Sequence, residues 1–348
     1  MRMKKIFKTQ TGLNNKSTSS KKLILDQFGR TFNYLRLAVN EMCNLRCIYC
    51  MPEDGIDFKS KDKILNKSEI FKLVQITSEM GVSKVRFTGG EPLLRKDIID
   101  IIRYTKSIST IDSVHLTTNG ILLSSFLNPL ETIGLDGINI SIDTLNREKY
   151  KIISRRDSLY QVIEPLKKAM ANNILKIKIN VVAMRNFNDD ELGDFIELTK
   201  ENNITVRFIE LMPFDSHQIW KTGKFYKADD IISDIKLKYN NLIIEQGSST
   251  EHHIFRVKGY KGKVAIIPSY TRSLCGQCNR IRITADGNLL NCLYSQNEIS
   301  LLDPIRKNLK DSELKNIIKK AMFEKSKDGW EAYKKKSDFR NSMTQIGG

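Results

Sequence analysis

Between about residue 33 and residue 211 the sequence alternates six times between a short apolar run and a longer amphipathic run. The short runs are rich in Val and Ile, as buried parallel strands are, and the longer runs have the apolar spacing of helices. Six strand–helix units predict an open or partial (β/α)6 barrel, or a doubly wound sheet. The expected strands are residues 33–40, 84–87, 113–117, 137–142, 175–182 and 204–210. The expected helices are residues 68–80, 97–107, 122–133, 159–172 and 189–202.

The alternation ends near Pro213, and the remaining sequence follows a different pattern. A helix is expected over residues 227–239, and it is followed by short strands at residues 242–245, 253–257 and 264–267. A cysteine-bearing segment, a Lys-rich helical stretch and a terminal glycine pair come next. We therefore expect an α/β domain over residues 26–214 and a smaller α+β domain over residues 215–348.

The 348 residues include 57 Lys and Arg against 40 Asp and Glu, a formal net charge of +17. This excess predicts an anionic partner, which is a nucleotide, a nucleic acid or an acidic lipid. Residues 1–25 are basic, polar and without periodicity, and we interpret them as a disordered extension. An organellar transit peptide is the alternative, but such peptides are usually rich in Arg, whereas this segment is rich in Lys.

Neither secretion nor membrane insertion is expected from the sequence. The N-terminus lacks the apolar segment of a signal peptide, and no apolar run approaches the roughly 18–20 residues of a membrane span. The sequence therefore predicts a cytoplasmic protein whose six cysteines are reduced, since disulfides are rare in that compartment.

Three of the cysteines, Cys43, Cys47 and Cys50, follow directly on the first expected strand with the spacing C-x3-C-x2-C. Three thiolates on one loop can hold three irons of a 4Fe–4S cluster, which leaves the fourth iron open for chemistry. A zinc site and buried thiols are the alternatives. Structural zinc usually takes four ligands, and no histidine or fourth cysteine lies nearby, so we favour the cluster.

The other three cysteines, Cys275, Cys278 and Cys292, have the spacing C-x2-C-x13-C and also lack a fourth ligand. A zinc ribbon completed by His252 or His253 is one interpretation of this spacing. A second 4Fe–4S cluster is the other, and we favour it.

Basic and polar residues follow the expected strands and the second cysteine triad. Arg280 and Arg282 would face the same side of a strand. Two guanidiniums on one face can bind a polyphosphate. The alternative, which is more usual for two arginines, is a basic face exposed to solvent. Thr117, Ser141 and Lys178 lie on expected strands, and barrel enzymes build their sites at the carboxyl ends of strands.

The first triad, with Tyr49 directly before its third cysteine, resembles the motif of the radical S-adenosylmethionine (SAM) superfamily. The run Gly89-Gly90-Glu91-Pro92 after the second expected strand agrees with that resemblance. The segment Cys278-Asn279-Arg280-Ile281-Arg282 and the terminal Gly347-Gly348 are more specific. With them, the chain from about residue 26 onward resembles the GTP 3′,8-cyclase family of molybdenum-cofactor biosynthesis.

The resemblance implies two 4Fe–4S clusters and SAM as cofactors, and GTP as the substrate, which is cyclised to 3′,8-cyclo-7,8-dihydro-GTP. It implies that the cluster on the first triad cleaves SAM, whereas the second cluster presents its open iron to the guanine base. The implied SAM contacts are Tyr49, Gly90, Glu91, Ser141 and Met212. The implied GTP contacts are Arg36, Lys84, Arg86, Thr117, Lys178, Arg280 and Arg282.

The same resemblance implies that the tail, Gly347 and Gly348, reaches into the active site without touching either cluster. It also implies an electron donor and a downstream pterin synthase as partners, and the protein is expected to be a monomer or homodimer that binds no nucleic acid. A peptide-modifying radical SAM enzyme and a zinc-dependent nucleic-acid-binding module are the rival interpretations. No residue for the final proton of the cyclisation can be named from the sequence.

Overall fold

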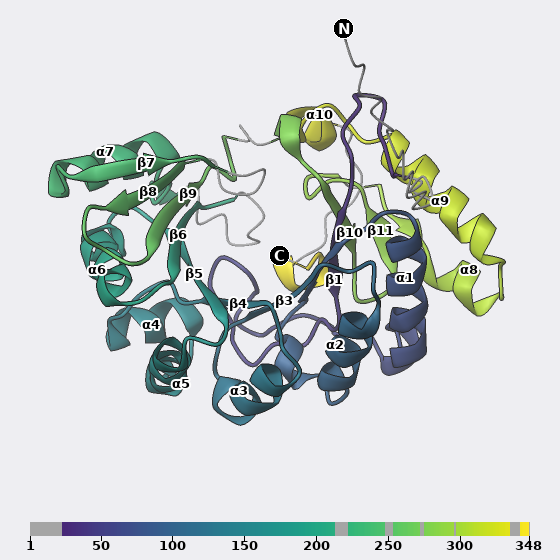
Figure 1. Ribbon diagram of the computed structural model, residues 1–348, viewed down its shortest axis with the longest axis horizontal. Helices are drawn as coiled ribbons and strands as arrows, with labels where there is room; N and C mark the ends of the chain where they lie inside the picture. Colours follow the sequence, from purple (N-terminus) through teal and green to yellow (C-terminus); the bar gives the residue numbers. More distant parts are fainter. Residues whose placement is uncertain are drawn as a thin grey trace, which may run out of the picture.

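The computed structural model describes residues 23–212, 222–247, 253–271, 275–295, 297–334 and 342–347. Its centre is a 12-stranded sheet with the order β12-β11-β10-β1-β2-β3-β4-β5-β6-β9-β8-β7. The sheet curls, and helices pack around its outer side (Figure 1). A doubly wound sheet would carry helices on both faces, so the partial barrel is confirmed.

The barrel part consists of six strands, each parallel to the next. They are β1 (Tyr34–Ala38), β2 (Lys84–Thr88), β3 (Ser113–Thr118), β4 (Gly137–Ser141), β5 (Lys176–Ala183) and β6 (Thr205–Glu210). The helices between them are α1 (Lys67–Glu79), α2 (Ile98–Ser107), α3 (Leu123–Thr132), α4 (Arg147–Ser154), α5 (Leu159–Asn172) and α6 (Leu192–Glu201). All five expected helices are present, whereas α4 was not expected.

The C-terminal strands extend this same sheet at both of its edges. After α7 (Ala228–Lys238), the strands β7 (Leu242–Glu245), β8 (His253–Val257) and β9 (Lys263–Ile267) add to β6. At the other edge β10 (Arg280–Ile283) pairs in parallel with β1, and β11 (Asn288–Leu290) and β12 (Ile299–Ser300) follow it. The helices α8 (Leu302–Arg306), α9 (Asp311–Phe323) and α10 (Gly329–Lys334) complete the described chain before the tail.

The hydrophobic core is shared by both parts of the chain. One cluster of buried side chains includes Phe87 from the barrel together with Phe255, Ile281 and Leu314 from the C-terminal part. Among the described residues of the smaller C-terminal domain expected over residues 215–348, the buried side chains of this cluster are therefore continuous with the barrel core. The expected boundary at residue 214 lies outside the described residues.

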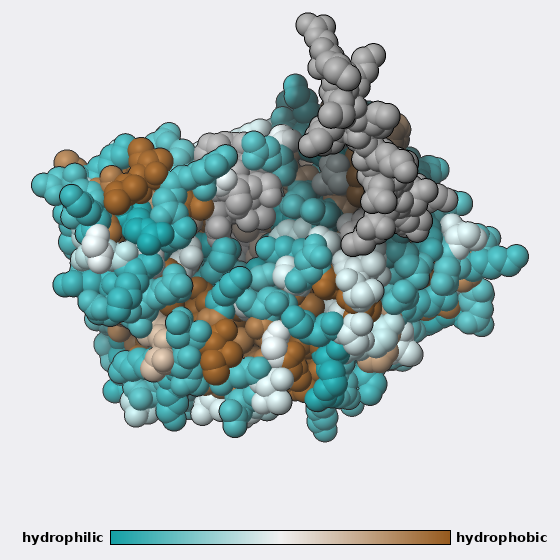
Figure 2. Space-filling model, viewed as in Figure 1, coloured by the Kyte–Doolittle hydropathy of each residue, from teal (hydrophilic) through white to brown (hydrophobic). Residues whose placement is uncertain are grey.

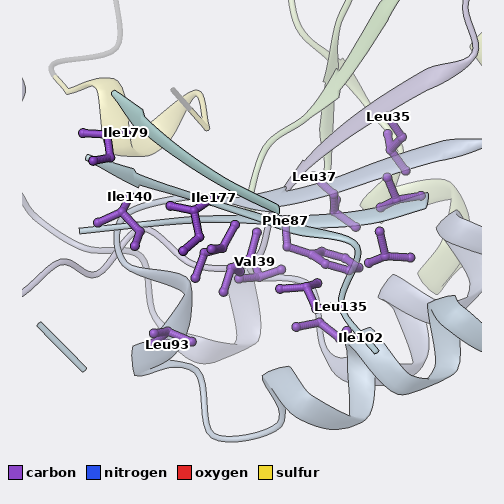
Figure 3. Close-up of a cluster of buried hydrophobic side chains, with 14 of the residues drawn as sticks. Leu35, Leu37, Val39, Phe87, Leu93, Ile102, Leu135, Ile140, Ile177 and Ile179 are labelled. Atoms are coloured by element: carbon purple, nitrogen blue, oxygen red, sulfur yellow. The ribbon is translucent and has the colours of Figure 1, made fainter. Parts of the chain in front are cut away.

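Alternation along β1 separates the core from the barrel interior. Leu35, Leu37 and Val39 are fully buried in the hydrophobic core, where Figure 3 shows Phe87 beside them. Since successive side chains of a strand point to opposite faces, Tyr34 and Arg36 face the inside of the barrel. This placement brings polar and charged side chains into the interior.

The described structure begins before the expected end of the N-terminal extension. Ile24 is fully buried in the core, and Leu25 forms a β-bridge with Thr31. Residues 1–22 of that extension lie outside the described residues. Within the described part of the chain, no helix is both long enough and apolar enough to cross a membrane.

Candidate active site

A cavity of about 370 Å³ lies between the two cysteine triads. This volume is within the usual range of small-molecule sites. Most of the residues expected to act together line it: all six cysteines, and Arg36, Tyr49, Lys84, Arg86, Gly90, Thr117, Ser141, Lys178, Met212, Arg280 and Arg282. Glu91 and Gly347 are not among the lining residues, and Gly348 lies outside the described residues.

The loop of the first triad is held by arginines and by its own backbone. Arg46 donates to the carbonyl oxygen of Cys43 at 2.8 Å, and the amide of Cys50 donates to the carbonyl of Cys47 at 2.8 Å. Arg155, at the end of α4, donates to the carbonyls of Arg46 and Met51, both at 3.0 Å. The unexpected helix α4 therefore braces the triad from outside.

The chemistry of this donor set fits an iron–sulfur cluster. All three residues are free thiols that line the cavity. Burial raises the pKa of Cys43, and that of Cys47 more strongly, and it raises the pKa of Cys50 to about 12. Buried thiols of this kind ionise only beside a compensating positive charge, which the irons of a cluster supply.

Gly89 and Gly90 press against the strand end that leads into the first triad. A Cβ on Gly89, whose φ is +132°, would lie 2.3 Å from the carbonyl oxygen of Asn40, and a Cβ on Gly90 would lie 2.1 Å from that of Met42. The amides of Gly90 and Glu91 donate to the same two carbonyls, at 3.0 and 2.7 Å. Only glycine permits this approach.

Glu91 has a different environment from the one expected of a SAM contact. Its side chain is fully buried, and its carboxylate accepts hydrogen bonds from Leu93 N (2.9 Å), Thr118 Oγ1 (2.8 Å) and Asn119 N (2.7 Å). Burial raises the pKa of this carboxyl to about 7. The carboxylate thus ties β2 to the end of β3, and Asn119 extends the connection to Asn44 in the triad loop at 2.8 Å.

Asp143 is a cavity residue to which no role was assigned from the sequence. Its Oδ2 accepts a hydrogen bond from the hydroxyl of Tyr49 at 2.7 Å, and its Oδ1 accepts one from the amide of Val182 at 2.8 Å. Burial raises the pKa of Asp143 to about 6. Asp143 is the second residue after β4, and this strand-end position was the signal that could have identified its role.

The loop of the second triad is anchored by Arg30, which was also not expected. Its Nη1 donates to the carbonyls of Cys275 (2.9 Å) and Lys327 (2.8 Å), and its Nη2 donates to that of Ser326 (2.7 Å). Its Nε pairs with Asp26 at 2.5 Å. The spacing of Asp26 and Arg30 in the sequence did not indicate that Arg30 contacts the second triad.

Three neighbouring strands, β10, β1 and β2, carry two rows of mostly cationic side chains into the cavity. In the first row, Arg280 and Lys84 are aligned with Tyr34, and in the second row, Arg282 and Arg86 are aligned with Arg36. Burial and Arg282 hold the pKa of Arg36 well below its usual range, and burial and Arg280 lower that of Arg282 to about 10. Crowded, desolvated cations favour the binding of a polyanion.

The thiol of Cys278 responds to the same positive charge. Burial acts to raise its pKa, but Arg280 and Lys325 outweigh burial and lower the pKa to about 6. The second triad therefore lies at the basic side of the cavity. Lys178, on β5, reaches the cavity from the opposite part of the barrel.

The segment that precedes the terminal glycine pair contacts the loop of the first triad. Ser342 Oγ donates to the carbonyl of Cys50 at 2.8 Å, and the amide of Met343 donates to the same oxygen at 3.2 Å. Gly347, with φ +68°, is buried against Ala38, and its carbonyl accepts from Thr88 Oγ1 at 3.2 Å. These contacts to the first triad come from Ser342 and Met343, so the expectation that Gly347 and Gly348 reach into the active site without touching either cluster stays a prediction.

Among the described residues, no three His, Cys, Asp or Glu side chains converge as ligands of a single metal ion do. A cubane cluster bonds its thiolates at separate iron corners, so its ligands need not converge in this way. His253 lies on β8 and does not line the cavity. His252, the other histidine considered for a zinc ribbon, lies outside the described residues.

Comparison with known proteins gives a close relative over nearly the whole chain. The chain is 44% identical over 331 residues to a protein of Chlorobaculum tepidum named GTP 3′,8-cyclase, covering 95% of this chain and 99% of the relative. The chain belongs to the GTP 3′,8-cyclase family. A family member of the same name from Peptoclostridium acidaminophilum is 41% identical, covering 83% of this chain and 88% of the relative.

Two family models match separate parts of this family member. Residues 38–199 match the radical SAM superfamily, and residues 204–330 match the model described as Molybdenum Cofactor Synthesis C. Human molybdenum cofactor biosynthesis protein 1 is 40% identical, covering 87% of this chain but 48% of the human protein. The cyclase-family chain thus spans about half the length of that relative.

Solved structures show the same fold at low sequence identity. Streptococcus suis SuiB bound to the precursor peptide SuiA gives a TM-score of 0.57 at 16% identity, covering 84% of this chain and 66% of the other. Native anSMEcpe with bound AdoMet gives 0.57 at 15% identity, covering 86% of this chain and 83% of the other. The family member therefore shares the radical SAM fold with these proteins.

Proposed function

We propose that this chain is a radical SAM enzyme that converts GTP to 3′,8-cyclo-7,8-dihydro-GTP, the first step of molybdenum-cofactor biosynthesis. The observation that carries this proposal is one cavity that holds both cysteine triads and two rows of cations. The names of the relatives from Chlorobaculum and Peptoclostridium support the reaction and the substrate.

Cys43, Cys47 and Cys50 would hold the first 4Fe–4S cluster, and Cys275, Cys278 and Cys292 a second one. When bound, the first cluster and SAM supply a 5′-deoxyadenosyl radical that removes the hydrogen from C3′ of GTP. Gly90, Tyr49, Ser141 and Met212 line the cavity, and we assign them to SAM. Glu91 acts through the backbone, because its carboxylate fixes the end of β3.

The cationic rows bind and orient GTP. Arg280 Nε and Arg282 Nη1 are buried without a hydrogen-bond partner among the described residues. Bidentate contacts to phosphate oxygens would satisfy such donors. Arg36, Lys84, Arg86, Thr117 and Lys178 line the same cavity, and we assign them to GTP as well. Binding energy from the triphosphate then fixes the ribose in a reactive position.

The tail closes the site from within the barrel. Gly347 occupies a space where a Cβ would lie 3.0 Å from the Cβ of Ala38, so a larger residue would not fit without displacement. We assign Gly347 and Gly348 to the catalytic arrangement, where they exclude water from the radical. A one-electron donor, and a downstream pterin synthase that takes the product, complete the proposed cytoplasmic reaction step.

Separate cysteine variants test the proposed division of labour. After anaerobic reconstitution, we expect Cys292→Ala to lose roughly half of the iron and all cyclisation, while reductive cleavage of SAM survives. Cys47→Ala should lose SAM cleavage itself. Iron content, 5′-deoxyadenosine and cyclised GTP are measured on each protein. Unchanged iron and unchanged cyclisation in Cys292→Ala would show that the second triad holds no cluster.

A further inference from the structure

Tyr34 is a titratable residue of the cavity to which the proposed function gives no role. It begins β1, is 5% exposed and lines the cavity. It pairs with Lys84 on one side and with Arg280 on the other. Because Arg280 follows Cys278 by two residues, Tyr34 lies toward the second triad. The resemblance to the cyclase family implies that the second cluster presents its open iron to the guanine base, so we place the base in this region of the cavity.

The hydroxyl proton of Tyr34 is available to a ligand. The phenol oxygen accepts a hydrogen bond from Arg86 Nε at 2.5 Å, and Lys84 Nζ lies 4.9 Å from the centre of the ring. Arginine and protonated lysine only donate, so neither can accept the phenol proton. Within the described residues the structure shows no acceptor for it.

The charges around Tyr34 make it an unusually strong acid for a tyrosine. They are Arg36 on its own strand, Lys84 and Arg86 on β2, and Arg280 and Arg282 on β10. Burial acts to raise the pKa of Tyr34, but Arg86, Arg36 and Lys84 outweigh it and lower the pKa from 10.0 to about 7. General acids work best when their pKa lies near the working pH.

Other acidic groups near the cavity do not offer a proton in the same way. Both carboxylate oxygens of Asp143 accept hydrogen bonds, from Tyr49 and Val182, at the loop of the first triad. Glu91 does not line the cavity. Guanidinium groups do not release their protons in proteins. Glu210 and Asp328 also line the cavity, but their carboxylates accept hydrogen bonds from backbone amides. The hydroxyl of Tyr294, another lining residue, donates its proton to Ser269 O. Tyr34 is therefore the best-placed acid for a ligand near the second triad.

We propose that Tyr34 is the catalytic residue that donates the proton completing the cyclisation, an inference that rests on the proposed function. As the bond between C3′ and C8 forms, the C8–N7 double bond opens, and the unpaired electron comes to lie on N7. N7 then gains one electron from a reduced iron–sulfur centre and the proton of Tyr34 Oη. The O–H bond breaks as N7–H forms, and water later reprotonates the phenolate.

Binding of GTP should itself keep Tyr34 protonated. The triphosphate neutralises part of the positive charge that stabilises the phenolate, so the pKa of Tyr34 rises in the complex. Above about pH 7 the free protein then takes up a proton as GTP binds, and by linkage the affinity for GTP falls as the pH rises. The Tyr34→Phe variant lacks the hydroxyl that titrates, so it should not show this proton uptake.

The first arm of the test measures this proton uptake without turnover. The anaerobically reconstituted protein, without SAM, is titrated with GTP near pH 8 in buffers of different ionisation enthalpy. We expect wild type to take up about one proton per GTP more than Tyr34→Phe does. Tyr226→Phe is the matched control, because Tyr226 is fully buried outside the cavity and donates to Asp234 at 2.5 Å. Equal proton uptake by wild type and Tyr34→Phe would overturn the proposal.

The second arm measures how SAM cleavage is coupled to product. With SAM, GTP and a chemical reductant, Tyr34→Phe should still form 5′-deoxyadenosine, but its cyclised product should fall by about 10²-fold. Tyr226→Phe should match wild type in both. The proposal is contradicted if Tyr34→Phe forms as much cyclised product per molecule of 5′-deoxyadenosine as wild type does. It is also contradicted if Tyr34→Phe binds GTP more than about tenfold more weakly than wild type. A wild type that cleaves SAM but never cyclises GTP would instead contradict the proposed function.

Discussion

At Gly90 the structure leaves no room for a side chain. A Cβ would lie 2.1 Å from the carbonyl oxygen of Met42, the residue before the first cysteine of the triad. The amide of Gly90 is also committed, since it donates to Asn40 O at 3.0 Å. The position of Cys43 therefore depends on a residue that is distant from it in sequence.

We expect Gly90→Ala to displace the strand end that carries Cys43 and to lower SAM cleavage by roughly 10²-fold, because small misplacements at a reactive site cost this much. Gly134→Ala is the control: its Cβ would meet nothing within 4 Å, and its φ of +66° adds a backbone strain that Gly90→Ala does not have, so the control is the more severe change in backbone conformation. Iron content and 5′-deoxyadenosine are measured for both. Wild-type cleavage of SAM by Gly90→Ala would show that this contact does not position the triad.

Residues with distinctive spacing were predictable, whereas residues that act through partners were not. The six cysteines and the pair Arg280 and Arg282 stand out by type and interval, and all line the cavity. Glu91 stands in an equally distinctive run, but its spacing does not show whether the carboxylate faces a ligand or a turn. Asp143 has the strand-end position of a site residue, but its hydrogen-bond partners and those of Arg30 are far away in sequence, and one sequence does not reveal them.

At the scale of elements, the strands of the barrel were predicted to within about two residues, because each has Leu, Val, Ile or Phe at every second position. Helix α1 begins where Asn66 and Glu69 form a capping box, a local signal that the sequence contains. The strands β10 to β12 are short and were not predicted. They become strands through pairing with β1 and with one another.

The segment before β1 and the loop before β10 depend on the buried pair of Arg30 and Asp26. Arg30→Ala removes three hydrogen bonds to carbonyl oxygens and leaves Asp26 buried without its partner. We expect a loss of about 3–5 kcal/mol in the free energy of unfolding, together with loss of iron from the second triad first. Arg147→Ala, which breaks the exposed pair with Asp157, should change little. Equal stability of the two variants in denaturant titrations would contradict this account.

At the scale of the whole molecule, the arrangement of the C-terminal part was not predictable from local pattern. We expected a separate smaller domain, but its strands extend the barrel sheet at both edges and share its core. Pairing between strands distant in sequence, such as β1 with β10, leaves no periodic signal. Outside the cavity, hydrophilic residues cover most of the face shown in Figure 2, in keeping with the charged composition.

The shared sheet places both triads around one cavity, and the central claim is that one reaction takes place there. GTP labelled with deuterium at C3′ tests this claim most directly. In anaerobic turnover with SAM and a reductant, we predict that 5′-deoxyadenosine acquires one deuterium for each molecule of cyclised product, and that Cys47→Ala forms neither. Cyclised product accompanied by unlabelled 5′-deoxyadenosine, or labelled GTP that is never consumed, would contradict the account.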